Sequence, residues 1–260
     1  MPRGVLLTHE ALARQLAAVA EHLGLEADDR VLIMGRPDSP AVLEQLLASL
    51  AVGATLVLRD GEVPEPDELV RDADDPITVV TMPAATANAL AAQGRVADRH
   101  FPCLRTVVLH GPGLTPEAAS RWLTRAAAPR LLEVHVVPEA GGTASVLALT
   151  REPSPASGPA GRTRIGRPIA GKPMWIVDRQ HQLCPPGVFG ELVIGGQALA
   201  LEYLDRPQAT AERFVPDFLD ASGRSGARLF RTGERARRLA DGTIELAAAR
   251  VTSMTPHDIA

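Results

Sequence analysis

The stretch Pro185–Phe214 reads PPGVFGELVIGGQALALEYLDRPQATAERF and decides how the second half of the chain is interpreted. Pro185–Gly187 favours a turn, because proline fixes φ and glycine supplies the position that needs a positive φ. Glu191–Ile194 is typical of a short strand, and Leu199–Tyr203 can resume the sheet after two glycines. Thr210 is placed to cap a turn of helix at the end of the stretch. These features predict a small β-rich unit.

Length and composition indicate a globular protein without a special class of partner. The chain has 260 residues, enough for one or two domains, and a formal net charge of -4, which argues against nucleic acid or an anionic membrane surface as a partner. Cys103 and Cys184 make no disulfide framework, and no metal-ligand spacing appears. Of the 27 basic residues only Lys172 is a lysine, which we attribute to genomic bias. With neither a signal-peptide pattern nor a membrane-spanning run, we expect a cytoplasmic protein.

Apolar strands alternate with helices through the first 150 residues. The expected strands are Val31–Met34, Thr55–Leu58, Ile77–Met82, Thr106–Leu109 and Leu131–Val137. The expected helices follow Thr8, run from Ser39-Pro40 to about Leu50, lie around Glu68–Asp72 and at Ala84–Gln93, and run from Thr115 to about Ala128. This alternation predicts a doubly wound α/β subdomain whose parallel sheet is covered on both faces.

The composition changes at Arg151–Gly161, REPSPASGPAG, which is typical of a linker or an exposed loop. Beyond it the predicted strands are short and separated by turns, as in a small barrel or sandwich. We therefore expect a parallel α/β subdomain at 1–150, a linker or loop at 151–163, a β-rich barrel-like subdomain at 164–250 and the remnant of a hinge region at 251–260.

The order of motifs identifies a family resemblance. GELVIGG, EYL and RPQATAERF resemble the sixth core motif of adenylate-forming (ANL superfamily) enzymes, in particular the adenylation domains of nonribosomal peptide synthetases, which reads GEL-x-I-x-G, GYL and RP-x-x-T-A-E-RF. The resemblance covers nearly the whole chain. It implies a flavodoxin-like parallel-sheet subdomain followed by a small β-rich subdomain, with ATP and Mg²⁺ as the family's cofactors.

Four positions correspond to cofactor-binding residues of that family, and of these only Glu139 keeps the family's residue type. Where the family has N-x-YGPTE, this chain has EVHVVPE, so the resemblance places Glu139 at the acid that helps to hold Mg²⁺ with ATP and His135 at the aromatic residue that stacks on adenine. Glu234 stands for the aspartate that binds the ribose diol in Y-R-T-G-D. Arg3 stands for the lysine of the PKGV phosphate loop, whose backbone N–H groups cradle the ATP phosphates.

Other positions depart from the family pattern. His110 replaces the first residue of a glycine pair that lines the pocket, and we expect it and Val134 to contact substrate. Pro40 stands where the family has the aspartate that holds an amino group, and Asp38 could take that role only if the register shifts by two. Pro138 cannot supply the hydroxyl of the family's threonine. These departures predict that ATP and Mg²⁺ binding is weak or lost.

Three functions remain open at this point. The first is a degenerate adenylation domain with a structural or docking role, which the internal departures favour. The second is a fragment of an ATP-dependent enzyme that adenylates an amino, keto or aryl acid. The third is a nucleotide- or acyl-adenylate-binding module without turnover.

The resemblance also predicts what lies around this chain. We expect the upstream phosphate loop and the lysine-bearing C-terminal domain of the family to lie outside it. We also expect a neighbouring synthetase domain or a partner protein to cover the face on which the family's preceding subdomain packs.

Overall fold

The structure, a computed structural model, describes residues 4–36, 38–58, 76–96, 101–111, 113–150, 157–158, 162–219 and 226–247. Arg3, the helix expected at Glu68–Asp72 and the hinge remnant expected at 251–260 lie outside the described residues, as does most of the predicted linker.

A parallel sheet forms the first part of the chain. Its strands are β2 (Arg30–Ile33), β3 (Thr55–Leu58), β4 (Val79–Pro83), β5 (Thr106–His110) and β6 (Arg130–Val137). They pair in the order β3-β2-β4-β5-β6, and every one of these pairs is parallel. Strands β2, β4, β5 and β6 are apolar and largely buried because helices cover both faces, whereas the edge strand β3 is partly exposed.

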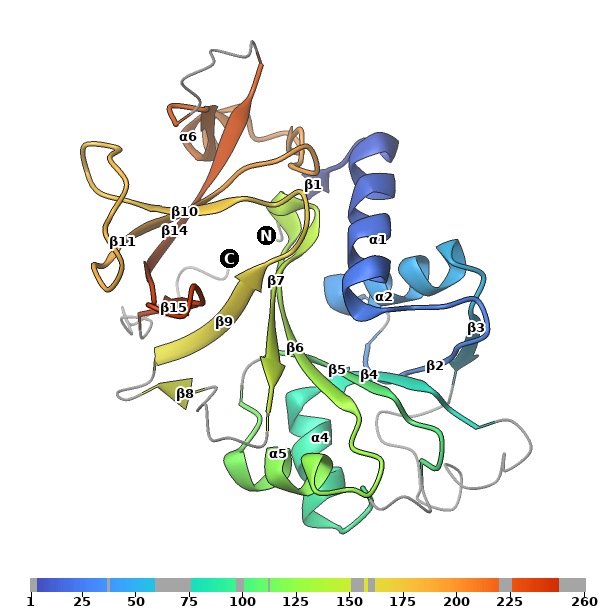
Figure 1. Cartoon of the computed structure of the whole chain (residues 1–260). Helices are drawn as coiled ribbons and strands as arrows, with labels where there is room; N and C mark the ends of the chain where they lie inside the picture. Colours follow the sequence, from blue (N-terminus) through green and yellow to red (C-terminus); the bar gives the residue numbers. More distant parts are fainter. Residues whose placement is uncertain are drawn as a thin grey trace, which may run out of the picture.

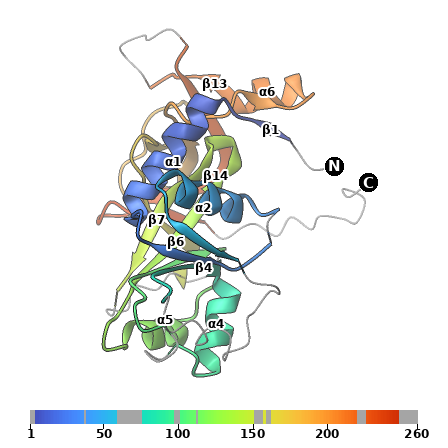
Figure 2. The same cartoon turned by 90° about the vertical axis from the view of Figure 1, so that its right-hand side faces the viewer.

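The helices lie in two layers around this sheet, as Figures 1 and 2 show. The first layer is α1 (His9–Leu23) and α2 (Pro40–Ala51), and the second is α4 (Ala84–Ala92) and α5 (Pro116–Leu123). Each layer packs its own apolar core against the sheet. The predicted doubly wound arrangement is therefore confirmed.

The helix ends follow capping chemistry where the sequence supplies it. The hydroxyl of Thr8 accepts a 3.0 Å hydrogen bond from the amide of Ala11 and so caps α1, and Thr115 caps α5 in the same way. Ser39 precedes Pro40 at the start of α2 but makes no side-chain capping bond. Helix α5 ends at Leu123, short of the predicted Ala128, because the chain must then reach the start of β6. None of the helices in the described ranges has the length and hydropathy of a membrane span.

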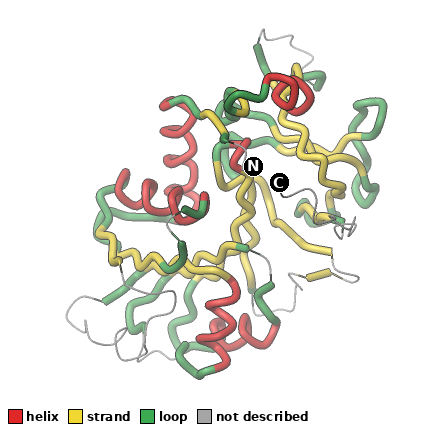
Figure 3. Tube along the Cα trace, turned by 180° about the vertical axis from the view of Figure 1, so that it is seen from behind, coloured by secondary structure: helices red, strands yellow, loops and turns green. Residues whose placement is uncertain are grey.

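A strand that the sequence did not predict, β7 (Gly142–Leu149), links the two parts of the molecule. It follows the short 3-10 helix η1 (Pro138–Ala140) and runs antiparallel to β6. Strand β9 (Arg162–Pro168) pairs with β7 on one side and with β15 (Ile244–Leu246) on the other. The parallel and antiparallel strands of the two parts consequently belong to one 13-stranded sheet, and only β1 (Val5–Leu6) and β12 (Glu202–Tyr203) of the described strands form a separate pair. The large sheet can be followed from behind in Figure 3.

The second part of the chain is β-rich, as predicted, and its strands pair antiparallel. It contains β10 (Met174–Val177), β11 (Gly190–Ile194) and the long β14 (Arg228–Arg238), with β13 (Phe214–Pro216) paired to β14. A third apolar core fills it. Strand β8 (Ser157–Gly158) and the start of β9 fall inside 151–163, the span predicted as a linker. These two strands pair with each other, so this part of the span belongs to the sheet.

The Pro185–Phe214 stretch is joined to the start of the chain. Strand β12 (Glu202–Tyr203) pairs with β1 (Val5–Leu6), and α6 (Pro207–Arg213) follows it. The predicted capping role of Thr210 is wrong, since Thr210 lies inside α6. Its hydroxyl instead accepts a 3.0 Å bond from the amide of Tyr203 and donates to the carbonyl of Arg206.

Candidate functional site

A cavity of about 520 Å³ opens where the carboxyl ends of β5 and β6 meet β9, β14 and the start of α2. Its lining includes four of the residues singled out from the sequence, namely His110, Val134, His135 and Glu234. The carboxyl ends of parallel strands are the edge at which open α/β sheets bind ligands. The fold thus brings residues more than a hundred positions apart into one candidate site.

His135 is held in its neutral form. Its Nε2 lies 3.8 Å from Oε2 of Glu234, but burial lowers the pKa of His135 to about 4. At neutral pH the imidazole therefore carries no charge that could pair with this carboxyl group. It can serve as a hydrogen-bonding group or as a flat surface for stacking.

Glu133 is a cavity residue that sequence reasoning overlooked. It is buried in β6, its Oε2 has no hydrogen-bond partner among the described residues, and burial raises its pKa to about 7. The available signal was an acid within the apolar run Leu131–Val137, since an unpaired acid is rarely buried. Nε2 of His110 is likewise buried without a partner in the described part of the chain, and burial lowers the pKa of that imidazole more than its hydrogen bond with the Met34 backbone raises it.

Glu139 lies on η1, next to the cavity rather than in its lining. Its Oε1 accepts a 2.7 Å hydrogen bond from the hydroxyl of Tyr203, and its carbonyl accepts a 2.9 Å bond from the amide of Ala200. Burial raises the pKa of Glu234, and the negative charge of Glu139 raises it further. The two acids that match the family are therefore within electrostatic range of each other.

The start of α2 presents Pro40 to the cavity and leaves Asp38 outside it. Pro40 is part of the lining, whereas the exposed carboxylate of Asp38 pairs with Arg36 at 2.7 Å. Within the described residues, no three His, Cys, Asp or Glu side chains come together as metal ligands would. Arg164, a cation in the cavity lining, has its Nη1 3.9 Å from Asp241.

Comparison with known proteins identifies the family. A family model described as "AMP-binding enzyme" matches residues 1–204. The probable non-canonical nonribosomal peptide synthetase CymA of Salinispora arenicola is 33% identical over 94% of this chain and 3% of its own length. Phosphinothricin tripeptide synthetase PhsC of Streptomyces viridochromogenes is 35% identical over 94% of this chain and 21% of its own.

Solved structures have the same fold. The crystal structure of CmiS6 matches with a TM-score of 0.80 at 27% identity, covering 95% of this chain and 59% of that one. NpsA-ThdA, a fused adenylation and carrier di-domain from Klebsiella oxytoca, matches with a TM-score of 0.76 at 23% identity, covering 95% and 44%. The chain thus spans a small part of the curated synthetases and about half of the solved chains.

Proposed function

Because the chain belongs to the AMP-binding enzyme family, we propose that it is a degenerate adenylation-domain region of a nonribosomal peptide synthetase-like system. It does not form acyl-adenylates and serves a structural or docking role. The observation that carries this proposal is the identity of the side chains at the cavity wall. Pro40 and His110 line the cavity at positions where the resemblance leads to a carboxylate and a glycine.

Both replacements change what the cavity can hold. Proline offers neither an acceptor nor a donor on its side chain, so it cannot bind an amino group. The imidazole of His110 occupies space that a glycine would leave open. Pro138, also in the lining, lacks the hydroxyl that the resemblance assigns to phosphate binding.

The charges beside the cavity fit an ATP–Mg²⁺ complex poorly. Glu133 and Glu234 both have raised pKa values, and the imidazole of His135 is neutral. One oxygen of Glu139 is already hydrogen-bonded to Tyr203. Transfer at phosphorus depends on cationic groups placed where negative charge develops. The lining of the described cavity instead contains the acids Glu133 and Glu234, and its arginine, Arg164, lies near Asp241. We therefore expect ATP and Mg²⁺ binding to be weak or lost.

The test is carboxylate-dependent exchange of labelled pyrophosphate into ATP, run with the full chain across amino, keto and aryl acids. We expect no exchange above background. Exchange that is abolished by Glu139→Gln but kept by Glu117→Gln, a change on the exposed first turn of α5, would overturn the proposal.

A second candidate has an observation of its own. The cavity is large enough for a small ligand, and Glu139 and Glu234 are close enough to interact. This favours a fragment of an ATP-dependent enzyme that adenylates an amino, keto or aryl acid, acting together with further segments. Calorimetry with ATP adds a further distinction. ATP binding without pyrophosphate exchange would support the remaining candidate, a binding module without turnover.

The docking role rests on an apolar face formed by α2 and β3. Leu43 and Leu50 on α2 are 51% and 54% exposed, and Leu58 on the edge strand β3 is 68% exposed. Exposed apolar side chains gathered on neighbouring elements, as on α2 and β3, are typical of an interface. We propose that a neighbouring synthetase domain or a partner protein covers it, and that neither nucleic acid nor a membrane is a partner. A cytoplasmic location agrees with this role.

A further inference from the structure

The turn that carries Glu139 connects β6 to β7, and the pairing of Val137 with Gly142 closes it. Within the turn, a backbone bond runs from the amide of Gly141 to the carbonyl of Pro138 at 2.9 Å. Gly141 and Gly142 follow, both with positive φ values, at 85° and 130°. Glycine loses more conformational freedom on folding than any other residue, so side-chain bonds from other elements help to order a turn of this composition.

Glu44 on α2 supplies bonds just after the turn. Its Oε1 accepts a 2.8 Å bond from the amide of Thr143, and its Oε2 accepts a short bond from the hydroxyl of Thr143. Gln15 on α1 donates to Oε1 of Glu44 and, at 2.9 Å, to the carbonyl of Thr143. A Cβ on Gly142 would lie 2.0 Å from Oε1 of Glu44, so a glycine is required for this close approach.

Lys172 supplies a bond at the end of the turn itself. Its Nζ donates a short hydrogen bond to the carbonyl of Ala140, and the residue is only 2% exposed. Burial lowers the pKa of Lys172 to about 7, while the charge of Glu44 favours the protonated amine. Burial raises the pKa of Glu44, and Lys172 opposes that shift. The two groups therefore stabilise each other's charge inside the fold.

The residue type at position 172 is informative. The chain has 27 Lys and Arg residues, and Lys172 is its only lysine. An ammonium group can donate to one carbonyl in a narrow buried site, whereas a guanidinium is a wide planar fork that keeps its charge. In a chain that otherwise uses arginine for its basic side chains, a buried lysine marks a position where the compact amine is needed.

We propose that Lys172 and Glu44 are positioning residues that clamp the Pro138–Thr143 segment at Ala140 and at Thr143 and thereby fix where Glu139 lies. The clamp reaches from α2 through β7 and η1 to the segment before β10, so it joins the parallel and antiparallel parts of the sheet. Its relevance to ligands rests on the site proposed above, but the clamp itself can be measured without any ligand.

The composition of the chain provides two reporters. Tyr203 is the only tyrosine, and its hydroxyl bonds Glu139. The NMR signal of the Tyr203 Cζ carbon therefore reports on the position of Glu139. Lys172 likewise gives a single signal in a chain labelled at lysine. Amide hydrogen exchange at 139–143 measures how often the turn opens.

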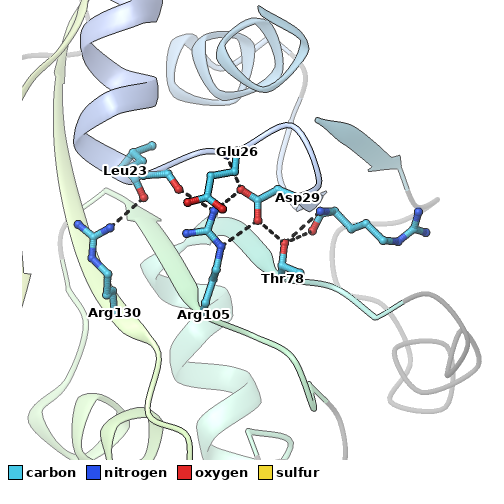
Figure 4. A network of polar contacts seen from close by, with 8 residues as sticks. Leu23, Glu26, Asp29, Thr78, Arg105 and Arg130 are labelled. Atoms are coloured by element: carbon cyan, nitrogen blue, oxygen red, sulfur yellow. Dashed lines mark hydrogen bonds and ion pairs between the residues drawn. The ribbon is translucent and has the colours of Figure 1, made fainter. Parts of the chain in front are cut away.

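The experiment compares Lys172→Met and Glu44→Gln with Arg105→Met as a matched control. Arg105 belongs to a separate network with Asp29 and Thr78 beneath α1, drawn in Figure 4. We expect Lys172→Met to shift the Tyr203 Cζ signal and to speed exchange at 139–143 by about tenfold or more, since a hydrogen bond to a charged group is lost. Glu44→Gln keeps the shape and one acceptor, so it should give a smaller change in the same direction. Arg105→Met should lower global stability yet leave the Tyr203 signal in place.

Global stability alone would not decide the matter, because replacing a buried charged group by an apolar group of similar size can change stability in either direction. Unchanged Tyr203 and turn-exchange signals in both Lys172→Met and Glu44→Gln would overturn the proposal. If Lys172→Met does not fold, measurements on Glu44→Gln and on the unmodified chain decide whether the clamp exists. In the unmodified chain, Lys172 ε-protons without cross-peaks to Ala140 would refute the clamp. None of these readouts depends on pyrophosphate exchange, so the clamp and the proposed function can fail separately.

Discussion

The hydroxyl of Tyr203 donates a 2.7 Å hydrogen bond to Oε1 of Glu139, joining two residues that are 64 positions apart in the chain. Tyr203 is buried on β12, where its ring also makes an edge contact with Phe214. Glu139 belongs to η1, at the junction between the parallel and antiparallel parts of the sheet. This bond fastens the Pro185–Phe214 stretch to the edge of the candidate site.

We predict that Tyr203→Phe lowers the free energy of unfolding by about 1.5–3 kcal/mol, because it removes a hydrogen bond to a charged group and leaves the ring in place. Urea denaturation at pH 7 measures the change. Glu139→Gln and the double variant complete a double-mutant cycle, and the coupling energy should be positive by about 1 kcal/mol. Fully additive losses would contradict a direct interaction between these side chains.

A second prediction concerns Asp29, at the opposite edge of the sheet. Burial raises the pKa of Asp29, but hydrogen bonds from Arg105, Thr78 and the Glu26 amide outweigh burial, so the pKa is lowered (Figure 4). The ionised carboxylate therefore stabilises the fold above the unfolded pKa of about 4, and this contribution is lost as the pH falls through the folded pKa.

Asp29→Asn should cost about 3 kcal/mol at pH 7, since it breaks a largely buried pair whose arginine is partly exposed. The difference from the unmodified protein should shrink below pH 4, which denaturation curves at several pH values would measure. Asp28→Asn changes the exposed neighbouring acid and serves as the control. Equal losses in the two variants would count against a specific role for Asp29.

Much of the fold could be predicted because local signals and tertiary packing agree. The strand at Arg30–Ile33 is apolar and lies between two helices, and Thr8 caps the helix before it as its residue type suggests. Strand β7 was not predicted, because its residues are buried on both faces and show no alternation of polar and apolar positions. The capping prediction for Thr210 is wrong because a threonine hydroxyl can also bond within a helix. Pro207, at the first helical position, indicates the start of α6 better.

The candidate site divides in the same way. Motif positions led to His110, His135 and Glu234, and the structure places them around one cavity. Neither the bond between Tyr203 and Glu139 nor the contact of Lys172 with Ala140 could be predicted, because each joins segments distant in sequence. Composition alone explains the single lysine by genomic bias, whereas the burial of Lys172 gives that residue a structural role.

The third prediction tests the apolar face on α2 and β3. Leu43→Ser and Leu50→Ser should each change the free energy of unfolding by less than about 1 kcal/mol, because about half of each side chain already contacts solvent. In the isolated chain, where no neighbouring domain covers this face, we expect the face to drive self-association, which the double variant should lower as measured by light scattering. Leu183→Ser, at a side chain that is 59% exposed in the connection between β10 and β11, is the matched control. A control that reduces association equally would mean that α2 is not the interface.

The last prediction uses the unpaired acid in the cavity. Burial raises the pKa of Glu133 from 4.5 to about 7, so the folded state binds this proton more tightly than the unfolded chain does. Stability from the protonated form is therefore complete below pH 4.5, declines as the pH rises and is gone above about pH 7.

Glu133→Gln should remove this pH dependence, because an amide does not ionise and has nearly the same size. Relative to the unmodified protein, the variant should gain up to about 3 kcal/mol in unfolding free energy on going from pH 4.5 to pH 8. Urea denaturation across that range measures it, with Glu117→Gln on α5 as an exposed control that should show no such gain. If Glu133→Gln tracks the unmodified protein at every pH, Glu133 is not a buried acid without a partner. The same result would mean that the cavity contains a cationic or hydrogen-bonding group that stabilises its ionised form.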